Sequence, residues 1–398
     1  MKILQLCSKV PYPPLDGGAI ASLNLAKGFV ENGNVVDILA MNTPKHYQSP
    51  ELSFIKNNLQ LIPVDVDTRI KPFKLLLNFL FSRLPYNAVR FISTSYAKKL
   101  VIFIKSQNYD IIQLEGLYVA PYIKVIRKNS KALIAFRAHN IEHEIWNRSL
   151  MLTKGVKKMY LKNLGKRLER FEKSFINKYD VLIPITKRDD DIFTKLSNIK
   201  PSFISPTGID LSKLESTKGT EKSPSLFYLG ALDWFPNQEG LIWFIEKVWT
   251  KFHTSHPELK FYVAGRNAPE WLEKKLKQHP IVYLGEIENA HKFITSKGIM
   301  IVPLFSGSGM RIKIIEGMAL GKVIIATPIA AEGIDVSHSE NIIIAKNEEE
   351  YINNIEILLK NRQLYSDIGR NAQKFIYKNY DNKTISSSLA EFYKSQLK

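Results

Sequence analysis

Residues 303–322 read PLFSGSGMRIKIIEGMALGK, and this stretch decides the fold. The apolar run 299–304 leads into a small glycine-bearing turn, and the turn opens a segment with helical spacing of apolar residues. A second apolar run, 323–326, follows at once. A strand, a helix and a strand in this order predict two parallel strands joined by a right-handed crossover, because parallel strands need a long connection.

The turn in the middle of this stretch is typical of an anion site. It consists of Gly307, Ser308, Gly309 and Met310. Backbone amides at a helix start have no acceptor within the helix, so they can cradle a phosphate. Arg311 and Lys313 then place two cations in the first turn, where the helix dipole opposes them, and a bound diphosphate would offset that conflict. Glu316, further along the same helix, could accept both hydroxyl groups of a ribose.

The alternation of strands and helices extends over the whole chain, in two halves. In the first half the apolar runs fall at 3–7, 35–41, 59–64, 111–114, 133–136 and 181–185. In the second half they fall at 226–229, 261–264, 281–284, 299–304, 323–326 and 342–345. We therefore predict an α/β fold with two doubly wound, Rossmann-like domains, residues 1–205 and 206–379, and a cleft between them.

Ligands of such sheets bind at the carboxyl ends of the strands, so the loops after other strands supply further candidates. These candidates are Gly17 and Gly18 after the first run, His139 after the run at 133–136, Gly265 and Arg266 after the run at 261–264, and Gly285 after the run at 281–284. His139 could hydrogen-bond a sugar hydroxyl or orient a reacting group, and Arg266 could reach a phosphate. Structural roles remain open, because glycine pairs often form simple turns and a histidine can be a buried hydrogen-bonded ring.

The formal charge of +18 on the 398 residues is concentrated in the first half of the chain. Residues 1–200 hold 32 Lys and Arg against 16 Asp and Glu, whereas residues 201–398 hold 24 against 22. Between Thr68 and Tyr109 no residue is acidic, and basic residues alternate with a Phe- and Leu-rich segment. Such a segment suits an anionic membrane surface. The alternatives are a solvated basic face over a core helix and nucleic-acid binding, and no nucleic-acid-binding motif supports the latter.

The composition excludes several classes of protein. A hydrophobic share of 45% and a charged share of 24% are typical of a globular protein and not of a disordered one. The single cysteine, Cys7, excludes a disulfide framework and favours a reducing compartment. The first apolar run is too short for a signal peptide, and no apolar stretch is long enough to span a bilayer. We therefore expect a cytoplasmic protein.

Two patterns could indicate a metal, and neither is convincing. His139 and His143 flank Glu142, but the first histidine ends a strand and no further ligand is evident. Residues 189–191 are three aspartates and contain a D-x-D pattern, which marks a metal–nucleotide site in a different transferase fold. They open a predicted helix, where the dipole favours acidic side chains without any metal.

Taken in chain order, the motifs resemble family 4 glycosyltransferases over nearly the whole chain. The motifs are Gly17-Gly18, His139-Asn140, 206–210 (PTGID), Gly265-Arg266, Gly285 and 307–316, and the most specific segment is 303–333. The resemblance implies the two-domain GT-B fold and a last helix, about 380–398, that returns to the N-terminal domain. It also implies transfer of a sugar from a nucleotide diphosphate with retention of configuration and without a required metal.

The resemblance assigns the nucleotide-sugar donor to the C-terminal domain, with one departure. Glu316 matches the second glutamate of the family's paired-glutamate motif, whereas Ser308 stands where the first would lie. The loop 230–237 also lacks the Arg and Lys that commonly bind the diphosphate, so that task falls to Arg311, Lys313 and Arg266.

With this resemblance, we expect a retaining, hexosyltransferase-type enzyme that transfers a sugar to a glycan or lipid-linked glycan in cell-surface polysaccharide biosynthesis. The predicted catalytic residues are His139, Arg311 and Lys313. The predicted donor-binding residues are Gly17, Gly18, Gly265, Arg266, Gly285, Gly307, Ser308, Gly309, Met310 and Glu316. No cofactor, no metal and no nucleic acid are expected, and the basic half should bring the protein to the inner face of a membrane. The alternative is a catalytically inactive nucleotide-sugar-binding or membrane-scaffold protein, which the serine at position 308 favours.

Overall fold

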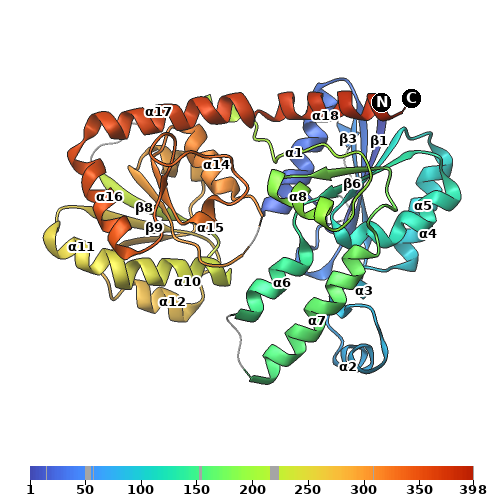
Figure 1. The fold of residues 1–398 in the computed structure, drawn as a ribbon, viewed down its shortest axis with the longest axis horizontal. Helices are drawn as coiled ribbons and strands as arrows, with labels where there is room; N and C mark the ends of the chain where they lie inside the picture. The colour runs from blue at the N-terminus through green and yellow to red at the C-terminus, as the bar shows by residue number, and fades with distance from the viewer. Residues whose placement is uncertain are drawn as a thin grey trace. The chain divides into compact units, whose positions relative to one another are not determined.

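The computed structural model describes residues 1–14, 16–49, 55–56, 58–151, 155–215, 224–307 and 309–397. The chain forms two compact units. The first consists of Met1–Gly208 together with Asn382–Lys398, and the second of Ile209–Asp381. Each unit contains one largely parallel sheet with helices on both faces, so the predicted α/β fold with two doubly wound domains is confirmed (Figure 1).

The sheet of the first unit has the strand order β3-β4-β2-β1-β5-β6-β7. Its strands are β1 (Lys2–Cys7), β2 (Val35–Asn42), β3 (Ile55–Lys56), β4 (Leu59–Asp65), β5 (Ile111–Glu115), β6 (Leu133–Ala138) and β7 (Val181–Pro184). All neighbours are parallel except the short edge strand β3, which pairs antiparallel with β4. The six parallel strands coincide with the six apolar runs, because strands covered by helices on both faces bury nearly every side chain.

The helices of the first unit cover the two faces of this sheet. They are α1 (Gly17–Glu31), α2 (Pro72–Phe81), α3 (Tyr86–Val89), α4 (Thr94–Ser106), α5 (Ile123–Asn129), α6 (Glu142–Met151), α7 (Gly155–Lys173), α8 (Lys187–Lys195) and α18 (Asn382–Gln396), with short 3-10 turns at Pro44–His46 and Leu117–Tyr122. Buried residues of α1 and α18 pack on one face of the sheet. Those of α4, α5, α7 and α8 pack on the other.

The sheet of the second unit is parallel throughout, in the order β10-β9-β8-β11-β12-β13. Its strands are β8 (Ser225–Leu229), β9 (Lys260–Ala264), β10 (Val282–Gly285), β11 (Ile299–Val302), β12 (Ile324–Ala326) and β13 (Ile343–Ile344). Its helices are α9 (Ser212–Glu215), α10 (Phe235–Trp243), α11 (Thr250–Ser255), α12 (Glu270–Leu276), α13 (Ala290–Thr295), α14 (Ile312–Ala319), α15 (Pro328–Ala331), α16 (Glu348–Lys360) and α17 (Arg362–Asn379), and a π-helical turn, Phe244–Trp249, joins α10 to α11.

Both sheets reverse their strand order at one point. In the first unit β1 lies between β2 and β5, and in the second unit β8 lies between β9 and β11. At such a point the crossover helices leave toward opposite faces of the sheet, so the carboxyl ends of the two central strands open a crevice for ligands. The loops after β1 and β5, and those after β8 and β11, are therefore the places where a site should form.

The last helix belongs to the first unit although 173 residues of the second unit precede it. Figure 1 shows α18 beside α1, and Asn32 Nδ2 donates to Ser386 Oγ over 3.0 Å. A Cβ atom on Gly28 would lie 2.3 Å from Ser386 Oγ, so glycine is what allows the two helices to approach this closely. The Tyr393 ring packs against Phe29, with 6.1 Å between ring centroids.

No helix among the described residues is long and apolar enough to cross a membrane.

Candidate active site

A pocket of about 180 Å³ lies at the reversal point of the first sheet. Its walls come from the end of β1, the start of α1 and the ends of β5 and β6. Its lining includes Lys9, Gly18, Ser22, Glu115, His139 and Glu142. Gly18 and His139, both predicted from the sequence, thus meet in one pocket, whereas Gly17 begins α1 without lining it.

The start of α1 is fixed by Asp16. Its carboxylate caps the helix by accepting the Ala19 amide at 3.0 Å, and Lys9 Nζ lies 2.6 Å from both carboxylate oxygens. Burial by itself would raise the pKa of Asp16, but Lys9 and the Ala19 amide outweigh it and lower that pKa. The cap therefore stays ionised and holds the first turn of α1, with Gly18, against the pocket.

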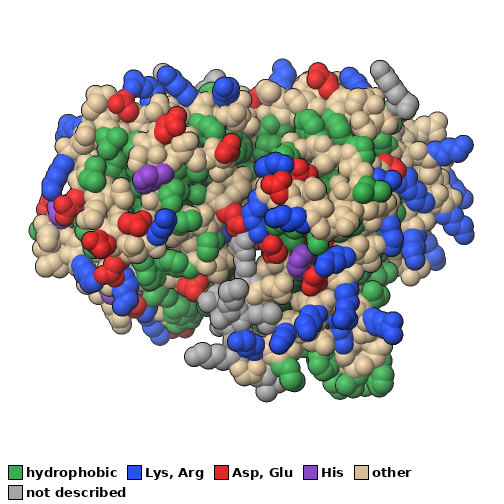
Figure 2. All heavy atoms as spheres, in the orientation of Figure 1, with side chains coloured by type: hydrophobic (Ala, Val, Ile, Leu, Met, Phe, Trp, Pro, Cys, Tyr) green, Lys and Arg blue, Asp and Glu red, His purple; other side chains and the backbone are tan. Residues whose placement is uncertain are grey.

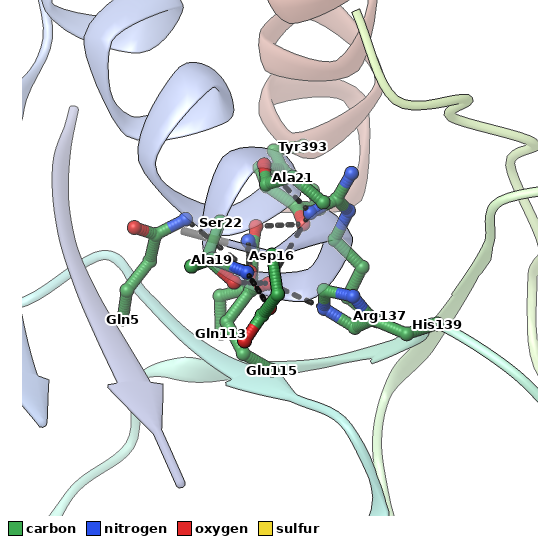
Figure 3. Close-up of polar contacts among 10 residues, drawn as sticks. All are labelled: Gln5, Asp16, Ala19, Ala21, Ser22, Gln113, Glu115, Arg137, His139 and Tyr393. Atoms are coloured by element: carbon green, nitrogen blue, oxygen red, sulfur yellow. Dashed lines mark hydrogen bonds and ion pairs between the residues drawn. The ribbon is translucent and has the colours of Figure 1, made fainter. Parts of the chain in front are cut away.

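The floor of the pocket is a buried polar network centred on the Glu115 carboxylate, at the end of β5 (Figure 3). One oxygen, Oε2, accepts hydrogen bonds from Ser22 Oγ at 2.7 Å and from Arg137 Nη1 at 3.2 Å, and lies 2.7 Å from His139 Nε2. The other oxygen, Oε1, accepts from the amide groups of Gln5 and Gln113. Three strands, β1, β5 and β6, and the helix α1 thus supply hydrogen bonds to one carboxylate.

Sheet register explains why these side chains meet. Glu115 pairs directly with Arg137 across β5 and β6, and Gln5 pairs with Gln113 across β1 and β5. Only 2% of the Glu115 side chain and 1% of the Arg137 side chain are exposed. Burial would raise the pKa of Glu115, but the Arg137 charge and the bonds from His139 and Ser22 lower it to about 2. The pocket therefore has a permanently charged floor at neutral pH.

His139 lies at the mouth of this network. It follows β6, and 15% of its side chain is exposed, while Nε2 is engaged with Glu115. A carboxylate that holds one ring nitrogen fixes the orientation of the imidazole. The other nitrogen is then the one left to meet a ligand, as a sugar-binding role for His139 requires.

Glu142, at the start of α6, is a second carboxyl group of the pocket. Burial and the neighbouring Glu172 carboxylate raise its pKa to about 7, although a hydrogen bond from Tyr118 opposes them. Glu172 itself is satisfied by His143 Nδ1 at 2.5 Å and by the Glu142 amide at 3.0 Å. The pocket therefore combines an ionised carboxylate with one that titrates near neutral pH. Glu115 was not singled out in the sequence, and Glu142 was weighed there only as a metal ligand.

The second unit brings the predicted lysine to its own reversal point. Lys313, in the first turn of α14, donates from Nζ to the Leu229 carbonyl at the end of β8 and to Asn237 Oδ1, each at 3.2 Å. The ammonium also lies 4.7 Å from the centre of the Tyr228 ring. Among the residues that the structure describes, these partners are all neutral. Burial, and secondly the Arg311 charge, lower the pKa of Lys313 to about 7.

Arg311 is the N-cap residue of α14, and its guanidinium lies against the turn that precedes it. Its Nη1 donates to the Gly309 carbonyl at 2.9 Å, and its Cζ lies 5.4 Å from the centre of the Trp234 ring. Gly307 and Gly309 have φ values of 97° and 83°, which glycine adopts without strain. Met310, beside them, is buried. Ser308 lies outside the described residues.

The other predicted donor residues lie at neighbouring strand ends. Gly265 donates its amide to the Gly285 carbonyl at 2.8 Å, and the Arg266 carbonyl accepts from Leu232. A Cβ atom on Gly265 would lie 1.9 Å from the Gly230 carbonyl oxygen, so glycine here already has a packing role. Whether these residues contact a donor stays a prediction.

Glu316 projects from α14 next to a histidine that the sequence analysis did not single out. His291 Nε2, from the start of α13, lies 3.6 Å from Glu316 Oε1, and both side chains are more than a quarter exposed. An exposed carboxylate near an imidazole donor can bind a ligand hydroxyl group.

The two metal-like patterns have structural explanations. Asp189 accepts from Arg188, Asp190 accepts from Ser202 Oγ at 2.6 Å, and Asp191 pairs with Lys187 at 2.7 Å. Across the described ranges, no three His, Cys, Asp or Glu side chains are grouped as a metal site would need.

We predict that Glu115→Gln destabilises the protein at pH 7 by about 3–5 kcal/mol, because Arg137 would be buried without its counter-ion. The folded pKa of Glu115, about 2, is below its ordinary value of 4.5. The stabilisation is therefore complete above about pH 4.5 and is lost as the pH falls through the folded value. Urea titrations at several pH values should show the two proteins converging toward pH 2. The exposed Glu31→Gln variant is the control, and a constant difference at all pH values would contradict the assignment.

Three comparisons with known proteins bear on this geometry. Residues 223–361 match the family described as Glycosyl transferases group 1. An "Uncharacterized 44.6 kDa protein in cps region" of Klebsiella pneumoniae is 26% identical over 404 residues, covering 98% of each chain.

Solved structures are similar in fold over nearly the whole chain. Sucrose-phosphate synthase from Thermosynechococcus elongatus superposes with a TM-score of 0.72 at 13% identity, covering 99% of each chain. Anabaena HepE in complex with UDP superposes with a TM-score of 0.69 at 15% identity, covering 99% of this chain and 100% of that one. HepE in complex with UDP-glucose gives 0.66 at 16% identity with the same coverage. The chain thus has the GT-B fold, and its residues 223–361 match the group 1 glycosyltransferase family.

Proposed function

We propose that this protein is a glycosyltransferase that transfers a hexose, with retention of configuration, from a nucleoside-diphosphate sugar to a glycan or lipid-linked glycan acceptor. The observation that carries the proposal is the half-buried ammonium of Lys313, which has only neutral partners among the described residues. A cation removed from water without a counter-charge is costly, and an anionic ligand at the reversal point would repay that cost. HepE, which shares the fold, binds UDP and UDP-glucose, and supports a nucleotide sugar as that ligand.

The residues of the second unit fit the three parts of such a donor. Lys313 and Arg311, with the amides of the glycine turn, would take the diphosphate. Glu316 would accept the ribose hydroxyl groups, with His291 beside it as a donor. Gly265, Arg266 and Gly285 would line the remainder of the donor site. As the sugar–phosphate bond breaks, negative charge grows on the leaving diphosphate, and preorganised cations and amides lower that barrier.

The pocket of the first unit would hold the sugar or acceptor side of the reaction. His139, oriented by Glu115, would hydrogen-bond a hydroxyl group of the reacting sugar, and Gly18 would let a ligand approach the α1 amides. Glu142 is near its pKa at neutral pH, so it can either donate to or accept from an acceptor hydroxyl group. The leaving diphosphate itself would take the acceptor proton.

The relative encoded in a cps region supports cell-surface polysaccharide biosynthesis as the pathway in which the proposed transfer occurs. A lipid-linked acceptor would place the reaction at the cytoplasmic face of a membrane, and the basic first half of the chain would draw the protein there by electrostatic attraction. The alternative, an inactive nucleotide-sugar-binding protein, rests on the serine at position 308. Product formation from a panel of donors and acceptors separates the two, because the inactive protein binds donor without releasing nucleoside diphosphate.

We predict that Glu316→Ala weakens donor binding by roughly a hundredfold, because it removes two hydrogen bonds to a charged acceptor. Calorimetric titration with nucleoside diphosphates and their sugars measures the effect. The exposed Glu340→Ala variant, in the same unit, should bind normally. Unchanged donor affinity and turnover in Glu316→Ala would rule out the ribose assignment.

We predict that donor binding at pH 8–9 is accompanied by proton uptake at Lys313. The folded pKa of about 7 lies below the ordinary 10.5, so the free protein holds this lysine largely neutral there, whereas a bound diphosphate favours the charged form. Without ligand, between about pH 7 and pH 10.5 the unfolded chain keeps the Lys313 proton that the folded protein has lost. The free energy of unfolding therefore rises with pH across that range.

Titration calorimetry in two buffers of different ionisation enthalpy measures the uptake directly. Lys313→Met should abolish it and weaken binding by about 1.5–3 kcal/mol, while the exposed Lys360→Met should change neither. Equal heats in both buffers with the parent protein would contradict the role of Lys313.

We further propose that transfer needs no divalent metal, since Arg311, Lys313 and helix amides supply the positive charge that a metal would otherwise supply. Turnover should be unchanged after dialysis against EDTA. Loss of activity that Mn²⁺ or Mg²⁺ restores would overturn this point.

A further inference from the structure

The helix α2 presents its apolar stripe to solvent. Its large apolar side chains are exposed: Phe73 by 72%, Leu76 by 54%, Leu77 by 41%, Leu80 by 58% and Phe81 by 81%. These positions follow the spacing i, i+3, i+4, i+7 and i+8, which places them along one side of a helix. No residue of α2 is buried. An amphipathic helix normally turns this stripe toward the core, so its exposure indicates a surface that meets another apolar phase.

The opposite side of α2 is anchored to α7, so the helix is held in this orientation. Arg167 donates to the carbonyls of Asn78 and Phe79 at 2.9 and 2.7 Å, which ties the last turn of α2 to α7. The Phe79 ring packs against Tyr160 with 5.8 Å between centroids. At the other end, the Lys71 amide donates to Tyr86 Oη at 3.0 Å. The exposed stripe is thus the free side of a fixed helix.

Basic residues lie next to the apolar stripe. In the sequence around α2, no residue between Thr68 and Tyr109 is acidic. On and next to α2, Lys74 and Arg83 are exposed. On α7 the exposed basic residues recur every fourth position: Lys158, Lys162, Lys166 and Arg170. Figure 2 shows blue side chains over α7 and a green group at the lower end of the same unit, where Figure 1 has α2. Apolar side chains with basic residues next to them are complementary to lipid chains beneath anionic headgroups.

We propose that α2 is a membrane-docking helix that inserts its apolar stripe into the interface of an anionic lipid bilayer. Ile70 and Leu84, exposed by 63% and 43%, extend the inserted surface beyond both ends of the helix. Burial of five to seven such side chains supplies the attraction, and the neighbouring cations select membranes with anionic lipid. The proposal concerns lipid binding alone, so its test does not depend on the proposed donor or reaction.

Vesicle sedimentation with a matched pair of double variants tests the proposal. Leu76→Ser with Phe81→Ser removes side chains exposed by 54% and 81%, and Ile102→Ser with Ile199→Ser removes side chains exposed by 58% and 81% elsewhere in the same unit. On vesicles of phosphatidylcholine with phosphatidylglycerol, the first pair should lose about tenfold or more in partitioning, and the second should bind like the parent. None of the four residues is buried, so folding is not at risk.

A second measurement reports insertion directly. Because Cys7 is the one cysteine of the chain and is buried, Phe81→Cys and Ile199→Cys can each be labelled with a polarity-sensitive dye. On anionic vesicles the dye at position 81 should report an apolar environment, and the dye at position 199 should not.

Equal losses for the two double variants, or no change at position 81, would overturn the proposal. So would binding to pure phosphatidylcholine as tight as to anionic vesicles. A parent protein that dimerises through α2, and that becomes monomeric in Leu76→Ser with Phe81→Ser without any vesicle binding, would show that a second copy covers the stripe instead.

Discussion

The first unit depends on one buried carboxylate. Glu115 is the charge that makes it possible to bury Arg137, and it collects hydrogen bonds from three strands and from α1. A buried ion pair repays its desolvation only when further hydrogen bonds satisfy the remaining lone pairs, and here both oxygens are fully engaged. Glu115 Oε2 accepts a hydrogen bond from Arg137 and also orients His139. The same carboxylate therefore neutralises the buried arginine and fixes the imidazole in the pocket.

The second unit shows the opposite electrostatic design. Lys313 is held at the end of β8 by a carbonyl and an amide oxygen, which position the ammonium but do not neutralise it. In the pocket of the first unit the Glu115 carboxylate is paired with Arg137, whereas the described partners of Lys313 carry no negative charge. A lysine held in this way, with its pKa lowered to about 7, is suited to binding an anion, because a negatively charged ligand favours its protonated form.

The sequence predicted the parallel strands well, because buried strands are continuous apolar runs and need no knowledge of their neighbours. It did not predict Glu115 as a site residue, since its importance arises from register: β5 must lie beside β6 for Glu115 to face Arg137. The short strand β3 was also missed, because two residues carry no periodic signal. Lys313 was predicted from the turn before it, but its partner Asn237 lies in the first turn of α10, 76 residues earlier in the chain. The Phe- and Leu-rich, basic character of the segment around α2 was predicted, whereas neither the helix nor the direction of its apolar stripe was.

The path of the chain has a consequence for its synthesis. The first unit includes α18, whose Tyr393 hydroxyl donates to Gln113 Oε1 at 2.6 Å and so joins the polar network around Glu115. Residues Ile209–Asp381, by contrast, are contiguous. During translation the second unit can therefore close before the first, although its residues leave the ribosome later. The pocket around His139 becomes fully supported only after α18 has emerged, so this candidate site forms later than the sheet that carries it.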